Sequence, residues 1–236
     1  MNYGEPMPTA RERAAAELAG RPPREWEAYL RGASGLPGPR ANLELAQAAA
    51  DAGDEAMFRR WLHGGDEYLA LCGAIGVGRL IAQGSDDLWP LLRAAATDPR
   101  WRVREGVAMG LQRIGDADAG RLLDEVEGWA DGPPLLRRAA VTGVCEPRLV
   151  TDADVAVRAV ELLDRVTGTL LAEPDRRSAD VRTLRQALGY CWSVAVAAHP
   201  EAGAPVFARL AAVDDPDARW IVKENLTKKR LAGLGA

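Results

Sequence analysis

Two stretches of this sequence decide its fold: DPRWRVRE at residues 98–105 and DPDARWIVKE at residues 215–224. Both begin with Asp-Pro, and both then carry the pattern Trp-x-Val-(Arg/Lys)-Glu. A third copy, GPPLLRRAA, covers residues 132–140, and a weaker fourth runs from about residue 65 to residue 81. Each copy follows an amphipathic segment; these segments cover residues 54–63, 88–97, 119–129 and 204–213. The sequence therefore predicts a repeated unit of one helix, a tight turn and a second helix.

The Asp-Pro step explains how each turn starts the second helix. An Asp side chain accepts hydrogen bonds from the free backbone N–H groups of a helix start, and Pro fits the first helical position because its missing N–H would be unpaired there. One helix pair cannot bury its apolar stripe alone, so the pairs must stack. This Asp-Pro-x-x-x-Val-Arg pattern resembles the HEAT repeat and covers most of residues 54–231. The resemblance implies an all-α, right-handed α-α superhelix in a single domain.

The remaining helices are expected at the N-terminus and in the middle of the chain. Strand signals are nearly absent, and the apolar residues recur at helical spacing. Residues 1–53 are expected to be N-terminal capping helices, and residues 54–236 HEAT-like repeats. The capping helices should cover residues 9–31 and 41–52, and two longer helices should cover residues 151–171 and 178–198.

Composition describes a folded chain without an obvious membrane or export segment. The 236 residues include 30 Lys and Arg against 34 Asp and Glu, a net charge of −4, with 47% hydrophobic residues. That balance is typical of globular proteins. No apolar stretch approaches the roughly 20 residues of a membrane span, and no secretory signal is visible. Cys72, Cys145 and Cys191 are odd in number and far apart, which argues against a disulfide framework. We expect a cytoplasmic bacterial protein with buried cysteines.

Several kinds of chemistry lack their sequence motifs. The two histidines, His63 and His199, are far apart, and no CxxC or HExxH motif is present, so no metal site and no cofactor are expected. No GxxxxGK[ST] phosphate loop occurs. Gly73, Gly76 and Gly78 have the wrong spacing for a nucleotide loop and follow no strand, so we interpret them as points of close helix packing.

Basic residues concentrate on the second helices of the predicted pairs, which line the concave face of a HEAT-like stack. Such a basic stripe suits a phosphate backbone. An equally ordinary interpretation pairs each Arg with the Asp of an adjacent turn. That interpretation is favoured for Arg104 and balanced against the first for Arg137 and Arg138. The pI of about 5.4 argues against a strong non-specific DNA binder.

A more specific resemblance lies in three short motifs. Trp101 and Glu105 have the spacing of a Trp and an acid that share one helix face. The stretch LLRRAAV at residues 135–141 follows about one repeat later, and ALGY at residues 187–190 follows farther on. Together they resemble the bacterial alkylpurine DNA glycosylases built from HEAT-like repeats. Glu105 stands where that family has Asp, and Tyr190 stands where it has Trp. A second branch of the same superfamily carries an Arg-Arg pair followed by Pro-Arg-Leu. Arg137 and Arg138, with PRL at residues 147–149, are similar to that stretch.

The resemblance implies hydrolysis of the N-glycosidic bond of a cationic alkylated purine in duplex DNA by a monomer. Glu105 would stabilise an oxocarbenium-like sugar and place a water molecule, while Trp101 and Tyr190 would offer π-faces to the cationic nucleotide. Arg138 would hold a flanking phosphate. These four are the candidate catalytic residues. The candidate DNA-binding residues are Arg104, Arg137, Arg148, Lys223, Lys228, Lys229 and Arg230.

Each of these residues also has a purely structural interpretation. Trp101 and Trp220 occupy equivalent repeat positions, so both rings would pack against the preceding helix. Glu105 would pair with Arg102, and Tyr190 would join the core with Trp192. The alternative function is a non-catalytic HEAT-repeat scaffold that binds a protein partner on its concave face, with Trp and Arg as anchors. Accessory work on a modified enzyme or pigment-bearing partner is a third possibility.

Overall fold

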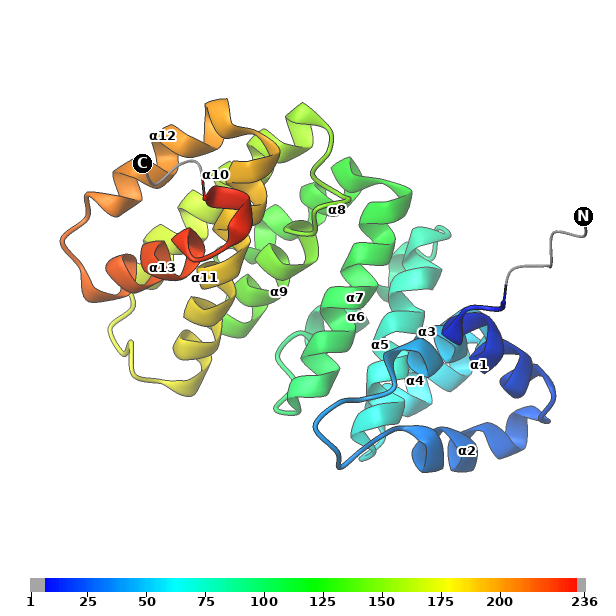
Figure 1. Ribbon diagram of the computed structural model, residues 1–236. Helices are drawn as coiled ribbons and strands as arrows, with labels where there is room; N and C mark the ends of the chain where they lie inside the picture. Colours follow the sequence, from blue (N-terminus) through cyan, green and yellow to red (C-terminus); the bar gives the residue numbers. More distant parts are fainter. Residues whose placement is uncertain (1–6, 233–236) are drawn as a thin grey trace, which may run out of the picture. The chain divides into compact units, whose positions relative to one another are not determined.

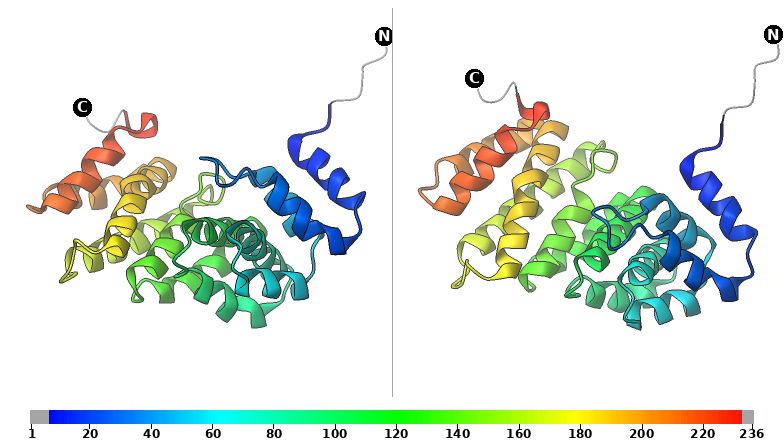
Figure 2. Two further views of the ribbon diagram at one scale, coloured as in Figure 1. Left: turned by 90° about the horizontal axis from the view of Figure 1, so that it is seen from below. Right: turned by 60° about the horizontal axis from the view of Figure 1, so that its bottom comes forward.

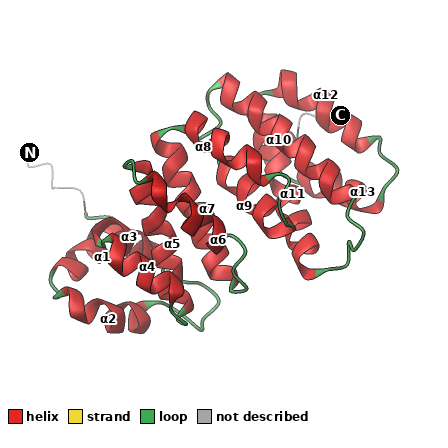
Figure 3. Ribbon diagram, turned by 180° about the vertical axis from the view of Figure 1, so that it is seen from behind, coloured by secondary structure: helices red, strands yellow, loops and turns green. Residues whose placement is uncertain are grey.

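The described residues of the chain are entirely helical. The computed structural model describes residues 7–232, and in this range thirteen α-helices are joined by turns and short 3₁₀ segments, with no strand (Figure 3). The all-α prediction is confirmed. The chain divides into two compact units, one reaching to Gly110 and the other beginning at Leu111 (Figure 1). The division falls inside α7 (Trp101–Ala117), so the two units are described separately.

The first unit is built around α5, the most buried helix in it. Its helices, with the first part of α7, are α1 (Ala10–Ala19), α2 (Trp26–Ala33), α3 (Leu43–Ala52), α4 (Glu55–His63), α5 (Glu67–Ala82) and α6 (Trp89–Ala95). α5 packs against α2, α3, α4 and α6. The predicted helical segment 9–31 is divided into α1 and α2, because Gly20, Pro22 and Pro23 interrupt it.

The second unit is centred on α11, which lies between α9 and α13 and also contacts α10 (Figure 2). Its helices, with the end of α7, are α8 (Ala119–Val126), α9 (Pro134–Val144), α10 (Ala153–Leu171), α11 (Ala179–Ala198), α12 (Pro200–Ala211) and α13 (Pro216–Leu226). The two longer helices, α10 and α11, lie where the sequence predicts them. α12 begins before the predicted residue 204, because His199 caps it and Pro200 fills its first position.

The Asp215-Pro216 turn has the predicted capping geometry, with Asp215 as the cap and Pro216 as the first residue of α13. The Asp98-Pro99 turn differs, because α7 begins at Trp101, two residues after the proline. The Asp215 Oδ1 atom accepts hydrogen bonds from the backbone N–H groups of Asp217, at 2.8 Å, and Ala218, at 3.3 Å. Asp98 Oδ1 accepts one from the backbone N–H of Arg100, also at 2.8 Å. The Asp215 carboxylate therefore satisfies two backbone donors that the start of α13 would otherwise leave free, and Asp98 satisfies one in the turn before α7.

A buried amide fastens α13 to α11. Asn225 is fully buried, and its Nδ2 donates to the carbonyls of Leu188, at 2.9 Å, and Ile221, at 2.8 Å. Its Oδ1 accepts from the backbone N–H of Ser193, at 2.8 Å. Because all three contacts are satisfied without solvent, this side chain fixes the register of the two helices.

The three cysteines are free and buried, as predicted. Cys145 and Cys191 are neighbours in the fold although they are far apart in the sequence. The pKa of the Cys145 thiol is raised well above its ordinary value, most by a hydrogen bond with the Cys191 thiol and next by burial. The Cys145 thiol is therefore not a reactive thiolate at neutral pH.

The prediction of close helix packing at three α5 glycines is confirmed. A Cβ atom at Gly78 would lie 2.3 Å from the Gly110 Cα atom of α7, and one at Gly76 would lie 2.4 Å from the Phe58 ring. At Gly73 the nearest atom is the Phe58 carbonyl oxygen, at 2.9 Å. Side chains at these positions would push the neighbouring helices apart, so α5 can contact α4 and α7 only as a glycine-bearing helix.

The substitution Gly78→Ala tests this close approach. The added methyl group meets backbone atoms that cannot rotate away, so we expect a loss of about 1–3 kcal/mol in the free energy of unfolding. Gly168→Ala, in the last turn of α10, is the matched control because nothing lies within 4 Å of a Cβ atom there. It should stabilise the protein by up to about 1 kcal/mol. Equal thermal unfolding midpoints for the two variants would contradict the packing.

Candidate functional site

The first candidate cluster lies at the start of α7, in the first unit. Trp101 is 51% exposed, whereas its neighbour Arg102 is only 5% exposed. The Arg102 guanidinium carbon lies 3.6 Å from the centroid of the Trp101 ring. Its Nη1 donates to Glu105 Oε2 at 2.9 Å, and its Nη2 donates to the Pro39 carbonyl at 3.0 Å. Arg102 therefore joins the two predicted site residues to the loop before α3.

These contacts bear on the structural interpretations of Trp101 and Glu105. The Trp101 ring rests on a guanidinium and keeps about half of its surface in solvent, so it is not a core residue. Glu105 forms the ion pair with Arg102 that the structural interpretation predicted, one turn along α7. The pair fixes one carboxylate oxygen, so Glu105 has a defined orientation rather than the freedom of a solvated surface charge.

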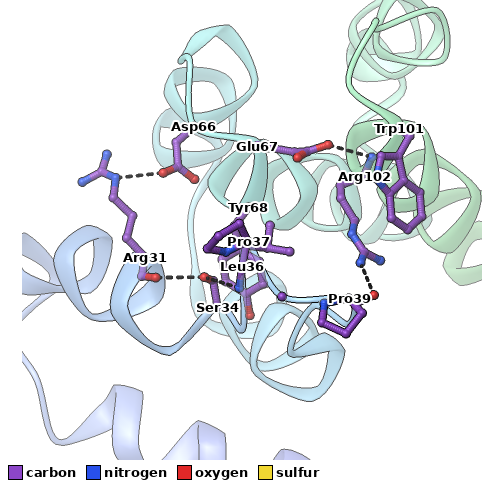
Figure 4. Close-up of a pocket in the computed structure, with 11 residues that line it drawn as sticks. Arg31, Ser34, Leu36, Pro37, Pro39, Asp66, Glu67, Tyr68, Trp101 and Arg102 are labelled. Atoms are coloured by element: carbon purple, nitrogen blue, oxygen red, sulfur yellow. Dashed lines mark hydrogen bonds and ion pairs between the residues drawn. The ribbon is translucent and has the colours of Figure 1, made fainter.

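A pocket of about 530 Å³ opens beside this cluster, between residues 34–39, the start of α5 and the start of α7 (Figure 4). Glu67 Oε1 accepts from the backbone N–H of Arg102 at 3.1 Å, and Asp66 Oδ2 accepts from Arg31 Nε at 3.2 Å. The buried Arg102 Nε has no hydrogen-bond partner. The pocket thus holds two carboxylates and two guanidinium groups beside apolar walls from Pro37 and Tyr68, and it is of a size that suits a small polar ligand.

The arginines predicted to bind DNA are mostly engaged within the protein. Arg104 donates to the carbonyls of Asp98 and Pro99 in its own turn, at 2.6 and 2.8 Å. In the second unit, Arg137 is buried in an ion pair with Glu173. Arg148 pairs with the carboxylates at positions 116 and 146, at 2.7 and 3.0 Å. Arg138 is partly buried on α9. The turn arginines are thus largely committed to internal contacts.

The predicted cations at the C-terminal end are different. Within residues 7–232, none of Lys223, Lys228, Lys229 and Arg230 forms an ion pair. Lys228 is partly buried, and the other three are exposed. We call Lys228, Lys229 and Arg230 the C-terminal cation cluster. Positive charge that no nearby carboxylate neutralises is the kind of surface that attracts an anionic partner.

Tyr190 lies against this cluster. It is 43% exposed, so the interpretation of Tyr190 as a core residue is wrong, whereas Trp192 is fully buried as predicted. Arg230 Nη2 donates to the Tyr190 hydroxyl at 3.0 Å, and its guanidinium lies 5.0 Å from the ring centroid. Trp220 instead packs against Gly189 of α11. A basic cluster with an exposed aromatic ring is therefore present in the second unit.

The predicted site residues fall into two groups. Trp101 and Glu105 belong to the first unit, while Tyr190 and Arg138 belong to the second. Sequence analysis did not identify Arg102 as the residue that joins Trp101 to Glu105, or Glu67 as part of a pocket. The Arg102–Glu105 ion pair itself is the one that the sequence predicts from their spacing of three residues. The contact with Pro39 had no sequence signal.

Comparisons with known proteins add few constraints on the function. No protein-family model matches the chain, and no curated protein matches it significantly. Among the helices of residues 7–232, none combines the length and apolar character needed to cross a membrane. In the same residues, no three His, Cys, Asp or Glu side chains come together as a possible metal site. The function must therefore be argued from the two clusters.

The turn carboxylates predict how stability depends on pH. Burial alone would raise the pKa of Asp215, but hydrogen bonds from Arg176 and from the backbone N–H groups of the helix start lower it. The Asp98 pKa is lowered in the same way, with Arg100 as the partner. A depressed folded-state pKa contributes stability that is present above the unfolded value of 3.8 and lost as the pH falls through the folded value.

We therefore expect the thermal unfolding midpoint of the native protein to fall steeply below about pH 4. The double variant Asp98→Asn/Asp215→Asn should unfold at a lower temperature at pH 7, because it lacks both charged turn carboxylates and their ion pairs with Arg100 and Arg176. Its midpoint should then fall less than that of the native protein between pH 5 and pH 3. Parallel curves for the two proteins would show that these carboxylates do not carry the acid sensitivity. Calorimetry across this range makes the measurement.

Proposed function

We propose that this protein is a DNA repair protein of the HEAT-like alkylpurine glycosylase type. In this proposal its helix pairs stack as a right-handed superhelix, which binds duplex DNA and hydrolyses the N-glycosidic bond of a cationic alkylated purine. The observation that carries the proposal is the division of the cations into two groups. The turn arginines are engaged in internal contacts, whereas Lys223 and the C-terminal cation cluster form no ion pair with any of residues 7–232.

The C-terminal cation cluster supplies what a phosphate backbone requires. Lysine and arginine side chains displace the counterions of DNA, and this electrostatic term dominates non-specific affinity. Tyr190 adds an exposed ring that contacts a sugar or a base, and Arg230 holds its hydroxyl at 3.0 Å. The net charge of −4 makes this local arrangement important, because the chain as a whole does not attract DNA.

The proposed chemistry assigns the central role to Glu105. A purine alkylated at N3 or N7 is cationic, so it leaves with the electron pair of the C1′–N bond as a neutral base. The Glu105 carboxylate stabilises the oxocarbenium-like sugar, and a water molecule then attacks C1′ and loses a proton to the carboxylate or to solvent. Arg102 holds one oxygen of this carboxylate at 2.9 Å, which leaves the second oxygen to face the substrate. Trp101 offers a half-exposed π-face to the cation, and Arg138 holds a flanking phosphate.

The substitution Glu105→Gln tests this role. The amide retains the shape of the carboxylate but loses the charge that stabilises the sugar cation, so release of free methylated purine from a methylated duplex should fall by about 100-fold or more. Glu224→Gln is the matched control, because Glu224 occupies the equivalent position of the other Asp-Pro repeat. It should leave base release unchanged. Equal rates for Glu105→Gln and the native protein would remove Glu105 from the mechanism.

DNA binding is tested by neutralising two sets of three cations. Changing Lys228, Lys229 and Arg230 to Gln should weaken binding of a fluorescent duplex at low salt by about 10-fold or more. The control changes three ion-paired arginines of the second unit to Gln: Arg158, Arg165 and Arg209. Both variants lose the same formal charge, but the control should change the affinity less than threefold. Equal losses in fluorescence anisotropy titrations would contradict the assignment of the C-terminal cation cluster.

A further inference from the structure

An apolar groove runs between α12 and α13, and of the residues assigned to DNA binding its lining includes Lys223. It consists of two adjoining hollows of about 490 and 290 Å³, which share Ala211, Val222 and Leu226. Phe207 and Val196 contribute to the second hollow. Leu226 is 42% exposed although it borders both hollows. An apolar surface of this kind on a folded unit marks an interaction site more often than an isolated exposed leucine does.

The residues that line the groove recur at helical spacing along α12 and α13. On α12 the lining residues include Ala204, Ala208 and Ala211, which recur at intervals of one helical turn. On α13, Val222 and Leu226 have the same spacing. Small alanine side chains on one wall leave room for large apolar side chains of an occupant. An occupant with apolar residues at i, i+3 or i+4, and i+7 fills such a groove, and that pattern belongs to an amphipathic α-helix.

The charges at the groove identify the polar side of that helix. Its lining contains two cations, Arg219 and Lys223, and no carboxylate. Lys223 has no ion pair within the described part of the chain. Arg219 pairs with Asp214, whose side chain is 97% exposed, and so exposed a pair is readily exchanged for another carboxylate. Acidic residues beside the apolar stripe would complement both cations.

We propose that the α12–α13 groove binds an amphipathic α-helix of a partner protein, with large apolar residues along one stripe and Asp or Glu beside it. Leu226 is the central apolar contact, and Arg219 and Lys223 select the acidic flank. Lys223 is used in both proposals, whereas Leu226 belongs to neither cluster assigned to DNA chemistry, so variants of Leu226 test the groove separately. Either proposal can therefore fail without the other.

The test uses two labelled synthetic helical peptides with the same leucine stripe. One carries Glu and the other Lys on both flanks. We expect the full-length protein to bind the Glu peptide at least 10-fold more tightly than the Lys peptide in anisotropy titrations. The double charge reversal Arg219→Glu/Lys223→Glu should reverse that preference. Failure of both peptides to bind, or equal binding of the two, would overturn the proposal.

Two exposed apolar residues provide a matched pair of variants. Leu226→Asp should weaken binding of the Glu peptide by at least 10-fold, whereas Val213→Asp should not, because Val213 is 40% exposed but does not line the groove. Neither change buries a charge, so both variants should keep the native circular dichroism spectrum and melting temperature. Equal effects of the two substitutions would contradict the assignment. A native dimer in sedimentation that Leu226→Asp converts to monomers would identify a second copy as the occupant and overturn the partner helix.

Discussion

Pairing between turn carboxylates and nearby arginines is the constraint on which the rest of this structure depends. The Asp215 carboxylate caps α13 by accepting hydrogen bonds from backbone N–H groups at the start of that helix. It also accepts a hydrogen bond from Arg176, at 2.5 Å. Asp217 accepts from Arg185, also at 2.5 Å. One carboxylate thus fixes a helix start and a neighbouring element together. Because these arginines are engaged in internal ion pairs, they are poorly available to a ligand. The groups that a ligand can contact are therefore the few cations and carboxylates outside this pairing.

The residues outside that pairing are spread over both units, and each has a distinct chemical character. Arg102 orients Glu105 and supports the half-exposed Trp101, so the start of α7 combines a fixed carboxylate with an aromatic face. Lys228, Lys229 and Arg230 form no ion pair within the described part of the chain, and Arg230 contacts the exposed Tyr190. A fixed carboxylate suits bond cleavage at a cationic substrate, and unpaired cations suit a polyanion. The proposed repair function is the activity that uses both properties.

The sequence predicted those features that depend on local spacing. The Asp-Pro turns, the long α10 and α11 helices and the glycine contacts of α5 follow from capping, periodicity and the absence of a side chain. Features that depend on contacts between distant residues were not predictable in the same way. Arg137 finds its partner in the loop after α10, and Tyr190 is exposed because of its angular position on α11. Asn225 begins an Asn-x-Thr triplet, yet it is a fully buried hydrogen-bonding residue, which no local pattern indicates.

The central claim is that few cations of this protein are available to DNA, and the salt dependence of duplex binding by the native protein tests it most directly. Binding through Lys223 and the C-terminal cation cluster engages about four phosphates, so log K against log salt concentration should be linear with a slope of about −3 to −4. A slope steeper than about −7 would require the ion-paired turn arginines to contact phosphate as well. That slope, or the absence of any DNA binding at low salt, would contradict the account.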